Sequence, residues 1–345
     1  MKWKVLLAFI ALAHTTIAFA DREVSFWDDT QEGRRWSKFD FLFWKANEDA
    51  VVLTNETSPL FTTTDFTQTP VLHPKFNWDV GFRIAAGISP PCSDFEVIYD
   101  WIFYYTEAHQ ARHTDSNDLT NVNGQEGMFP IWALSEDIIA GDYVAEAHLD
   151  WQIFLTVFDW TFAKTWFLCD TFDLHPYAGL RFAYINQNVH IDYAGGIFLY
   201  NILNGGISRN GIDKVRMESD FIGLGPRIGI APRVSLCYGL SLFGDAAISG
   251  LGGVFYIDQN ERFINEERFD YDKTTSCIRA ISDLAAGLAW DKSFCDDKLH
   301  FRCQLSWEYH VFFSQMKFQR DAFDLVPSNN NLSVQGVTLS FSFGY

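Results

Sequence analysis

Basic residues are scarce in this sequence. It has 26 lysines and arginines against 44 aspartates and glutamates in 345 residues, a formal net charge of −18. Such a balance repels polyphosphate and leaves no basic footprint, so nucleic acid is excluded as a partner. Hydrophobic residues still make up 48% of the chain, which excludes wholesale disorder.

Long apolar runs are missing beyond the N-terminus. Lys2 and Lys4 precede an apolar stretch over residues 5–13, and Ala18-Phe19-Ala20 supplies the small-x-small pattern that signal peptidase accepts. We therefore expect a signal peptide over residues 1–20 and an exported protein over residues 21–345. After residue 20, no run approaches the roughly 18 apolar residues that a spanning helix needs, which excludes a helical inner-membrane protein.

Strict alternation of apolar and polar residues is what the mature sequence contains instead. Every even position is apolar over residues 76–88, and every odd position is apolar over residues 299–311. These runs last about 11 to 13 residues, the length of a tilted membrane strand and about twice that of a soluble strand. An aromatic content of 17% suits a membrane interface. The pattern predicts a transmembrane β-barrel.

The same alternation predicts ten strands. They cover residues 36–46, 76–88, 95–105, 145–157, 174–185, 219–230, 236–248, 279–290, 299–313 and 334–345. Long and short connections alternate strictly along the chain, as in outer-membrane barrels with tight periplasmic turns and long outer loops. We therefore predict an all-β, antiparallel up-and-down barrel in the bacterial outer membrane, with both termini in the periplasm. A twelve-stranded barrel, with an extra hairpin in a long loop, stays open as an alternative.

Three short segments resemble a known family. They are FNWDVGFR at residues 76–83, PYAGLR at residues 176–181 and FIGLGPR at residues 221–227. The sequence is similar over nearly all of its mature part to the Legionella-type major outer membrane protein-like family of pore-forming proteins, which also occurs in environmental chlamydiae. This resemblance implies a porin for passive diffusion of small hydrophilic solutes or ions, with a homo-oligomer among its assemblies. The last strand ends on aromatic Tyr345, which resembles the insertion signal of many outer-membrane proteins.

Three Gly-x-Arg units are the best candidates for pore chemistry. Both members of each unit face the same side of a strand, and we expect that side to be the lumen. The candidate pore-lining residues are Arg83, Arg181, Arg227, Asp79, Asp100, Asp150, Asp245 and Glu308. Two interpretations have equal weight: the arginines attract anions in a constriction, or they pair with the carboxylates to neutralise charge in a narrow barrel. With about ten strands the passage is slender, so we expect a small conductance.

Six cysteines in an exported chain favour disulfides over metal. The predicted topology places Cys92, Cys169, Cys237 and Cys295 near the periplasmic rim, and these four are the candidates for disulfide bonds. The family resemblance implies cross-links within a barrel or between envelope neighbours. Free thiols remain the alternative, and no connectivity follows from the sequence. We expect no metal site and no cofactor.

Two other functions stay open. Loop histidines and carboxylates suit an outer-membrane protease of the omptin type, namely His109, His113 and Asp115 in one predicted loop and His190 with Asp192 in another. Exposed loop residues of these types are more often merely solvated, so we expect no enzyme. The second alternative is a surface adhesin or structural envelope barrel. In either case the expected partners are outer-membrane lipid and lipopolysaccharide.

Overall fold

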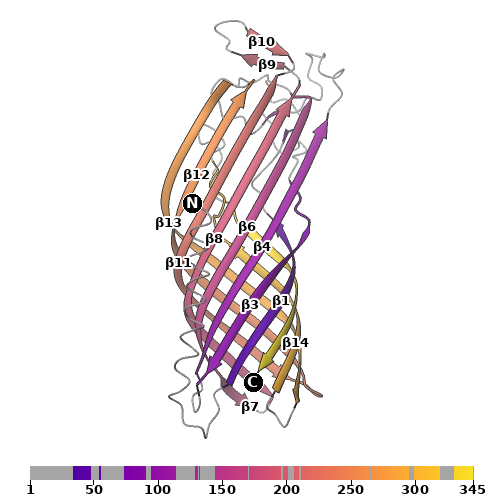
Figure 1. The fold of residues 1–345 in the computed structure, drawn as a ribbon, viewed down its shortest axis with the longest axis vertical. Helices are drawn as coiled ribbons and strands as arrows, with labels where there is room; N and C mark the ends of the chain where they lie inside the picture. The colour runs from indigo at the N-terminus through magenta and orange to yellow at the C-terminus, as the bar shows by residue number, and fades with distance from the viewer. Residues whose placement is uncertain are drawn as a thin grey trace, which may run out of the picture.

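Ten long strands form one closed antiparallel barrel in the computed structural model of the protein (Figure 1). The structure describes residues 34–47, 54–55, 74–90, 95–113, 129–130, 132, 144–169, 171–195, 197–200, 206–209, 211–264, 266–294, 299–318 and 330–344. The barrel strands are β1 (Arg34–Asn47), β3 (Trp78–Ser89), β4 (Phe95–His113), β6 (Glu146–Lys164), β8 (Phe172–Ala194), β11 (Ile212–Ser235), β12 (Leu240–Phe263), β13 (Glu266–Phe294), β14 (Leu299–Phe312) and β15 (Leu332–Gly344).

The ring follows the chain order. Each barrel strand pairs with the next one, β15 pairs with β1, and the sheet contains no crossover. The predicted fold class is therefore confirmed, with ten barrel strands within the described residues. The short strand β7 (Trp166–Cys169) pairs with the beginning of β8. Two separate two-stranded sheets consist of β2 (Thr54–Asn55) with β5 (Phe129–Pro130) and of β9 (Ile197–Tyr200) with β10 (Gly206–Arg209), the latter above the barrel in Figure 1. The predicted signal peptide lies outside the described residues.

Alternating burial shows which face of the barrel meets lipid. On β14, Leu305 and Trp307 are exposed on the outer surface, while Ser306 and Glu308 are buried inside. Exposed aromatic side chains lie near both ends of the lipid-facing zone: Trp78, Tyr105, Tyr256 and Tyr309 on the extracellular side, and Trp160, Trp166 and Trp290 on the periplasmic side. Such girdles mark membrane interfaces. Among the described residues, no helix is long and apolar enough to span a membrane.

The wall of the barrel is much taller on one side than on the other (Figure 1). The six consecutive strands from β4 to β13 contain 19 to 29 residues each, whereas β1, β3, β14 and β15 contain 12 to 14. The sequence predicted short strands throughout. Ten additional residues correspond to about 33 Å of strand, so the tall wall rises well beyond the lipid-facing zone.

The apolar face of each tall strand changes sides along its length. On β6, Trp160 and Phe162 are exposed on the outside, but further up Trp151 and Leu149 are buried inside and Asp150 is exposed outside. The reason is the solvent, because hydrocarbon surrounds the lower part of the barrel and water surrounds the upper part. A single alternation pattern fits only one of these zones, which is why the sequence-based strand boundaries stopped early.

An apolar core fills the extracellular part of the lumen. Its largest fully buried side chains include Trp44, Trp151, Tyr104, Phe221 and Phe255 from the barrel wall. Residues from the connections pack into the same core, namely Phe76, Trp132, Met316 and Phe318. In addition, the backbone N–H of Trp132 donates to the hydroxyl of Tyr193 on β8 at 3.3 Å. The described side chains therefore close the barrel at its extracellular end.

This division into two zones predicts where a new charge is tolerated. Ile228, on the outer face of β11, lies in the lipid-facing zone and Gln152, on the outer face of β6, lies above it. We expect Ile228→Arg to lower the free energy of unfolding by about 2–4 kcal/mol, and Gln152→Arg to change it by less than about 1 kcal/mol. Urea unfolding in lipid vesicles measures both. Equal losses would contradict the position of the lipid boundary.

Candidate functional site: a charge network across the lumen

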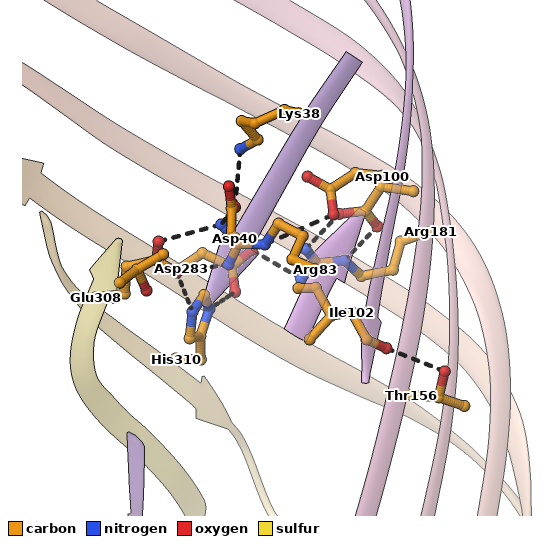
Figure 2. A network of polar contacts seen from close by, with 12 residues as sticks. Lys38, Asp40, Arg83, Asp100, Ile102, Thr156, Arg181, Asp283, Glu308 and His310 are labelled. Carbon is orange, nitrogen blue, oxygen red and sulfur yellow. Dashed lines mark hydrogen bonds and ion pairs between the residues drawn. The ribbon is translucent and has the colours of Figure 1, made fainter. Parts of the chain in front are cut away.

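A network of charged side chains crosses the lumen within the lipid-facing zone (Figure 2). Arg83 on β3 lies near its centre and contacts three carboxylates. Its Nη1 donates to Asp40 Oδ2 at 3.1 Å and to Glu308 Oε1 at 3.1 Å, and its Nη2 donates to Glu308 Oε2 at 2.5 Å. Asp100 lies 3.7 Å from Nε, and Lys38 extends the network by pairing with Asp40 at 3.1 Å.

Two further arginines lie on the neighbouring strands β8 and β11. Arg181 binds Asp159 in a bidentate manner, with Nε–Oδ1 and Nη2–Oδ2 distances of 2.7 Å, and its Nη1 donates to Asp283 at 2.7 Å. Arg227 also pairs with Asp283, and lies 3.3 Å from Asp159. It donates from Nη2 to the hydroxyl of Tyr177 at 3.1 Å. Two arginines thus share the same two aspartates.

His310 on β14 joins the two halves of the network. Its Nδ1 contacts Asp283 at 2.8 Å and its Nε2 contacts Glu308 at 3.1 Å. On the extracellular side, the indole ring of Trp44 packs against His310 and Arg83, with its centroid 4.8 Å from the imidazole ring and 5.7 Å from the guanidinium carbon of Arg83. The apolar core therefore begins directly above the network.

Burial makes this network costly to break. Arg181 is 2% exposed, and Asp283, Glu308 and Asp159 are 4–5% exposed. Charges taken out of water need partners, and removing one partner leaves an uncompensated charge that costs several kcal/mol. Each carboxylate here has a cationic or imidazole neighbour, so the ion pairs hold the lumen closed at this level.

Carboxylates outnumber the permanent cations in the network. The carboxylates are Asp40, Asp100, Asp159, Asp245, Asp283 and Glu308, and the cations are Lys38, Arg83, Arg181 and Arg227. Asp245 takes part through Tyr177, whose hydroxyl donates to Asp245 Oδ1 at 2.7 Å. With all six carboxylates ionised, the network carries a net negative charge even when His310 is protonated.

The glycines of the Gly-x-Arg units lie against the backbone of the neighbouring strand. A Cβ at Gly179 would lie 2.0 Å from the carbonyl oxygen of Trp160, and one at Gly225 would lie 1.9 Å from that of Gly250. These glycines let neighbouring strands approach closely where the barrel wall curves.

Six of the eight predicted residues lie within this network: Arg83, Arg181, Arg227, Asp100, Asp245 and Glu308. Asp79 lies apart from them and accepts a hydrogen bond from Thr106 Oγ1 at 2.5 Å. The prediction that Asp150 faces the lumen is wrong. It lies on the outer face of β6 with its side chain 60% exposed, because the alternation changes sides in this strand.

The sequence analysis missed several members of the network. Asp40, Asp283 and His310 lie inside predicted strands at positions that face the lumen, so their parity alone would have identified them. Asp159 lies beyond the predicted end of its strand at residue 157. Tyr177 and Lys38 lie on the lumen face of strands that also carry arginine and aspartate residues of the network. This position could have identified both residues from the sequence.

The histidines expected in two outer loops lie in strands instead. His109 belongs to β4 and His190 to β8, and both are direct cross-strand neighbours of Asp150 on β6. His109 contacts Asp150 through Nδ1 and Glu107 through Nε2, the latter at 3.3 Å. Asp115 lies outside the described residues, and no group of His, Cys, Asp and Glu within them is arranged to hold a metal ion.

Four of the six cysteines lie within the described residues, and all four are free thiols. Cys169 and Cys237 are exposed free thiols at the periplasmic end. Cys277 and Cys303 are free and partly buried. Cys92 and Cys295 lie outside the described residues, so the predicted disulfides stay a prediction.

Comparisons with known proteins identify a family for this chain and several solved structures to which it is similar. A family model described as the Legionella pneumophila major outer membrane protein precursor matches residues 32–344. Among solved structures, the outer membrane protease OmpT from Escherichia coli is 13% identical with a TM-score of 0.43, and the alignment covers 92% of this chain and 97% of that one. The toluene transporter TodX from Pseudomonas putida is 8% identical with a TM-score of 0.28, covering 93% and 91%. No curated protein matches the sequence.

The first prediction from the network concerns stability. Arg181→Gln removes the closest cationic partner of Asp159 and one of the two arginine partners of Asp283, so we expect the free energy of unfolding to fall by about 3–5 kcal/mol. The matched control is Asp150→Asn on the exposed outer wall, which should change it by less than about 1 kcal/mol. Urea unfolding in vesicles measures both, and a small loss for Arg181→Gln would show that the network is not tightly coupled.

The second prediction concerns His109 above the lipid. Hydrogen bonds to Asp150 and then to Glu107 raise the pKa of its imidazole above the usual value. Because the folded-state pKa is raised, the stabilisation is complete below the unfolded-state pKa and disappears as the pH rises through the folded-state pKa. Asp150→Asn should therefore lower the pKa of His109, as measured by NMR titration of its ring protons. An unchanged titration would contradict the contact.

Proposed function

Because the chain belongs to the Legionella major outer membrane protein family, we propose that it is a narrow outer-membrane channel for small ions or hydrophilic solutes. The observation that carries this proposal is the charge network across the middle of the lumen. Ionisable groups at membrane depth are expensive and are typical of solute pathways. In the conformation described, the channel is closed twice, by the network and by the apolar core above it.

The chemistry of the network supports a pathway rather than a simple seal. Apolar residues of similar volume close a lumen at equal or lower cost than buried ion pairs. The upper closure is of that apolar kind, whereas the lower one is built from arginines, carboxylates and His310. Arg83 and Arg227 each contact more than one carboxylate, so partner exchange can open a path without leaving a charge unpaired.

The excess of carboxylates sets the expected selectivity. Of the two interpretations of the arginines, pairing with carboxylates agrees better with the contacts, because each arginine is held by at least two of them. A net negative constriction attracts cations. The proposal is therefore a channel with a preference for cations over anions.

Bilayer recording under a salt gradient tests this function. We expect the wild-type protein to give small, infrequent openings whose reversal potential indicates cation preference. Glu308→Gln removes one negative charge and should shift the reversal potential toward anions, whereas Asp150→Asn on the outer wall should leave it unchanged. Absence of any conductance from correctly folded protein would overturn the proposal.

The apolar closure gives a separate prediction for the frequency of opening. Tyr193→Phe removes the hydroxyl that accepts the hydrogen bond from the backbone of Trp132. Losing one buried hydrogen bond costs about 1 kcal/mol, so openings should become about fivefold more frequent with an unchanged reversal potential. The same recordings measure this, and an unaltered opening frequency would show that the core does not control access.

The closed lumen also fits a surface adhesin or structural envelope barrel as a second candidate. Its supporting observation is the tall wall, which carries a polar outer face far above the lipid. Persistent lack of conductance together with loss of surface binding on deletion of residues 114–128 would favour it. We propose no catalytic role for the outer-wall histidines.

A further inference from the structure

Three basic side chains gather on the outer face of the tall wall. Lys214 and Arg216 lie on β11 and Arg262 lies on β12, all of them exposed. Lys214 is the direct cross-strand neighbour of Arg262, and Arg216 is two residues from Lys214 on the same face. We call Lys214, Arg216 and Arg262 the cationic patch. It is notable in a chain whose formal net charge is −18.

The arrangement of the cationic patch is unfavourable for the isolated protein. Like charges directly opposite each other in a sheet are destabilising. Arg262 has one weak ion pair, with Glu267 at 3.7 Å. Asp192 is the other cross-strand neighbour of Lys214, and Glu218 follows Arg216 on the same face. Among the described residues, however, neither Lys214 nor Arg216 forms an ion pair within 4.0 Å. An external anion would relieve this repulsion.

The height of the cationic patch above the lipid-facing zone indicates where the bound anion lies. Arg216 lies six positions along β11 from Ile222, where the continuous apolar run of the outer face (Ile222, Leu224, Pro226, Ile228 and Ile230) begins. This is about 20 Å along the strand and about 14 Å along the barrel axis at a tilt of 45°. Long basic side chains also reach down toward the interface. The patch therefore lies beside the head groups of the outer leaflet.

We propose that the cationic patch binds the phosphate groups of lipopolysaccharide in the outer leaflet. Phosphate accepts strong charge-assisted hydrogen bonds from Lys and Arg, and three cations within one surface suit a bisphosphorylated sugar better than a carboxylate. The acidic side chains around the patch, Glu218 and Asp258 among them, repel any anion at long range, so binding depends on direct contacts between the three cations and the phosphates. This docking surface is independent of whether the lumen conducts.

Binding of purified lipopolysaccharide to the refolded barrel in micelles tests the proposal. EDTA is present throughout, so bridging of phosphates to Glu218 and Asp258 by divalent cations is excluded. We expect the double variant Lys214→Gln/Arg216→Gln to bind at least about tenfold more weakly than the wild type. Lys292→Gln is the matched control, because this exposed lysine lies at the periplasmic end of β13, and its affinity should be unchanged.

Two further arms separate the sources of binding. Lipopolysaccharide whose phosphates have been removed should bind to the wild type as weakly as intact lipopolysaccharide binds to the double variant. Heat-dependent mobility on gels checks that every variant is folded. Equal binding of the double variant and the wild type, undiminished binding after dephosphorylation, or loss of wild-type binding in EDTA would each overturn the proposal.

Discussion

The closed ring of backbone hydrogen bonds is the constraint on which the rest of this structure depends. In hydrocarbon no water is present to satisfy an unpaired amide, so the sheet must close, and the pairing of β15 with β1 completes it. Above the lipid this requirement ends. There β4 continues without β3, since their pairing covers only residues 97–103 of β4, and β13 pairs with β14 only from Ile281 onward. Within the part of the chain that the structure describes, the upper wall is therefore an open sheet with β4 and β13 at its edges.

An open sheet in water must bury one face, and this explains the apolar core. The outer face of the tall wall meets water and is polar, so the inner face carries the apolar side chains. Residues from the connections, such as Trp132 and Phe318, cover that inner face. The upper part of the molecule is therefore built like a soluble β-protein, while the lower part is built for lipid. The change between them occurs within single continuous strands.

This change decides how much the sequence could predict. Where one environment surrounds a strand, as for β14, alternation gave both the bounds and the lumen face of Glu308. Where the environment changes, as in β6, it gave the strand but not its length, placed Asp150 on the wrong face and missed Asp159. Some arginine partners could not be predicted for another reason. Glu308 and Asp283 lie on strands distant in sequence from the arginines they bind, so only closure of the barrel with a known register brings Arg83 to Glu308.

The two closures of the lumen depend on different interactions, ion pairs in the network and apolar packing in the core above it. This difference determines which closure must open first. An ion pair at 4 Å weakens from about 4 kcal/mol to about 1 kcal/mol when the effective dielectric rises from partly buried protein to bulk water. The network stays tight only while water is kept out, and the side chain of Trp44 and the apolar core provide that exclusion. Loosening of the connections above would hydrate the network and release its pairs. In the proposed channel, access is thus governed at the top of the barrel, and the charged residues below act on the ions that then enter.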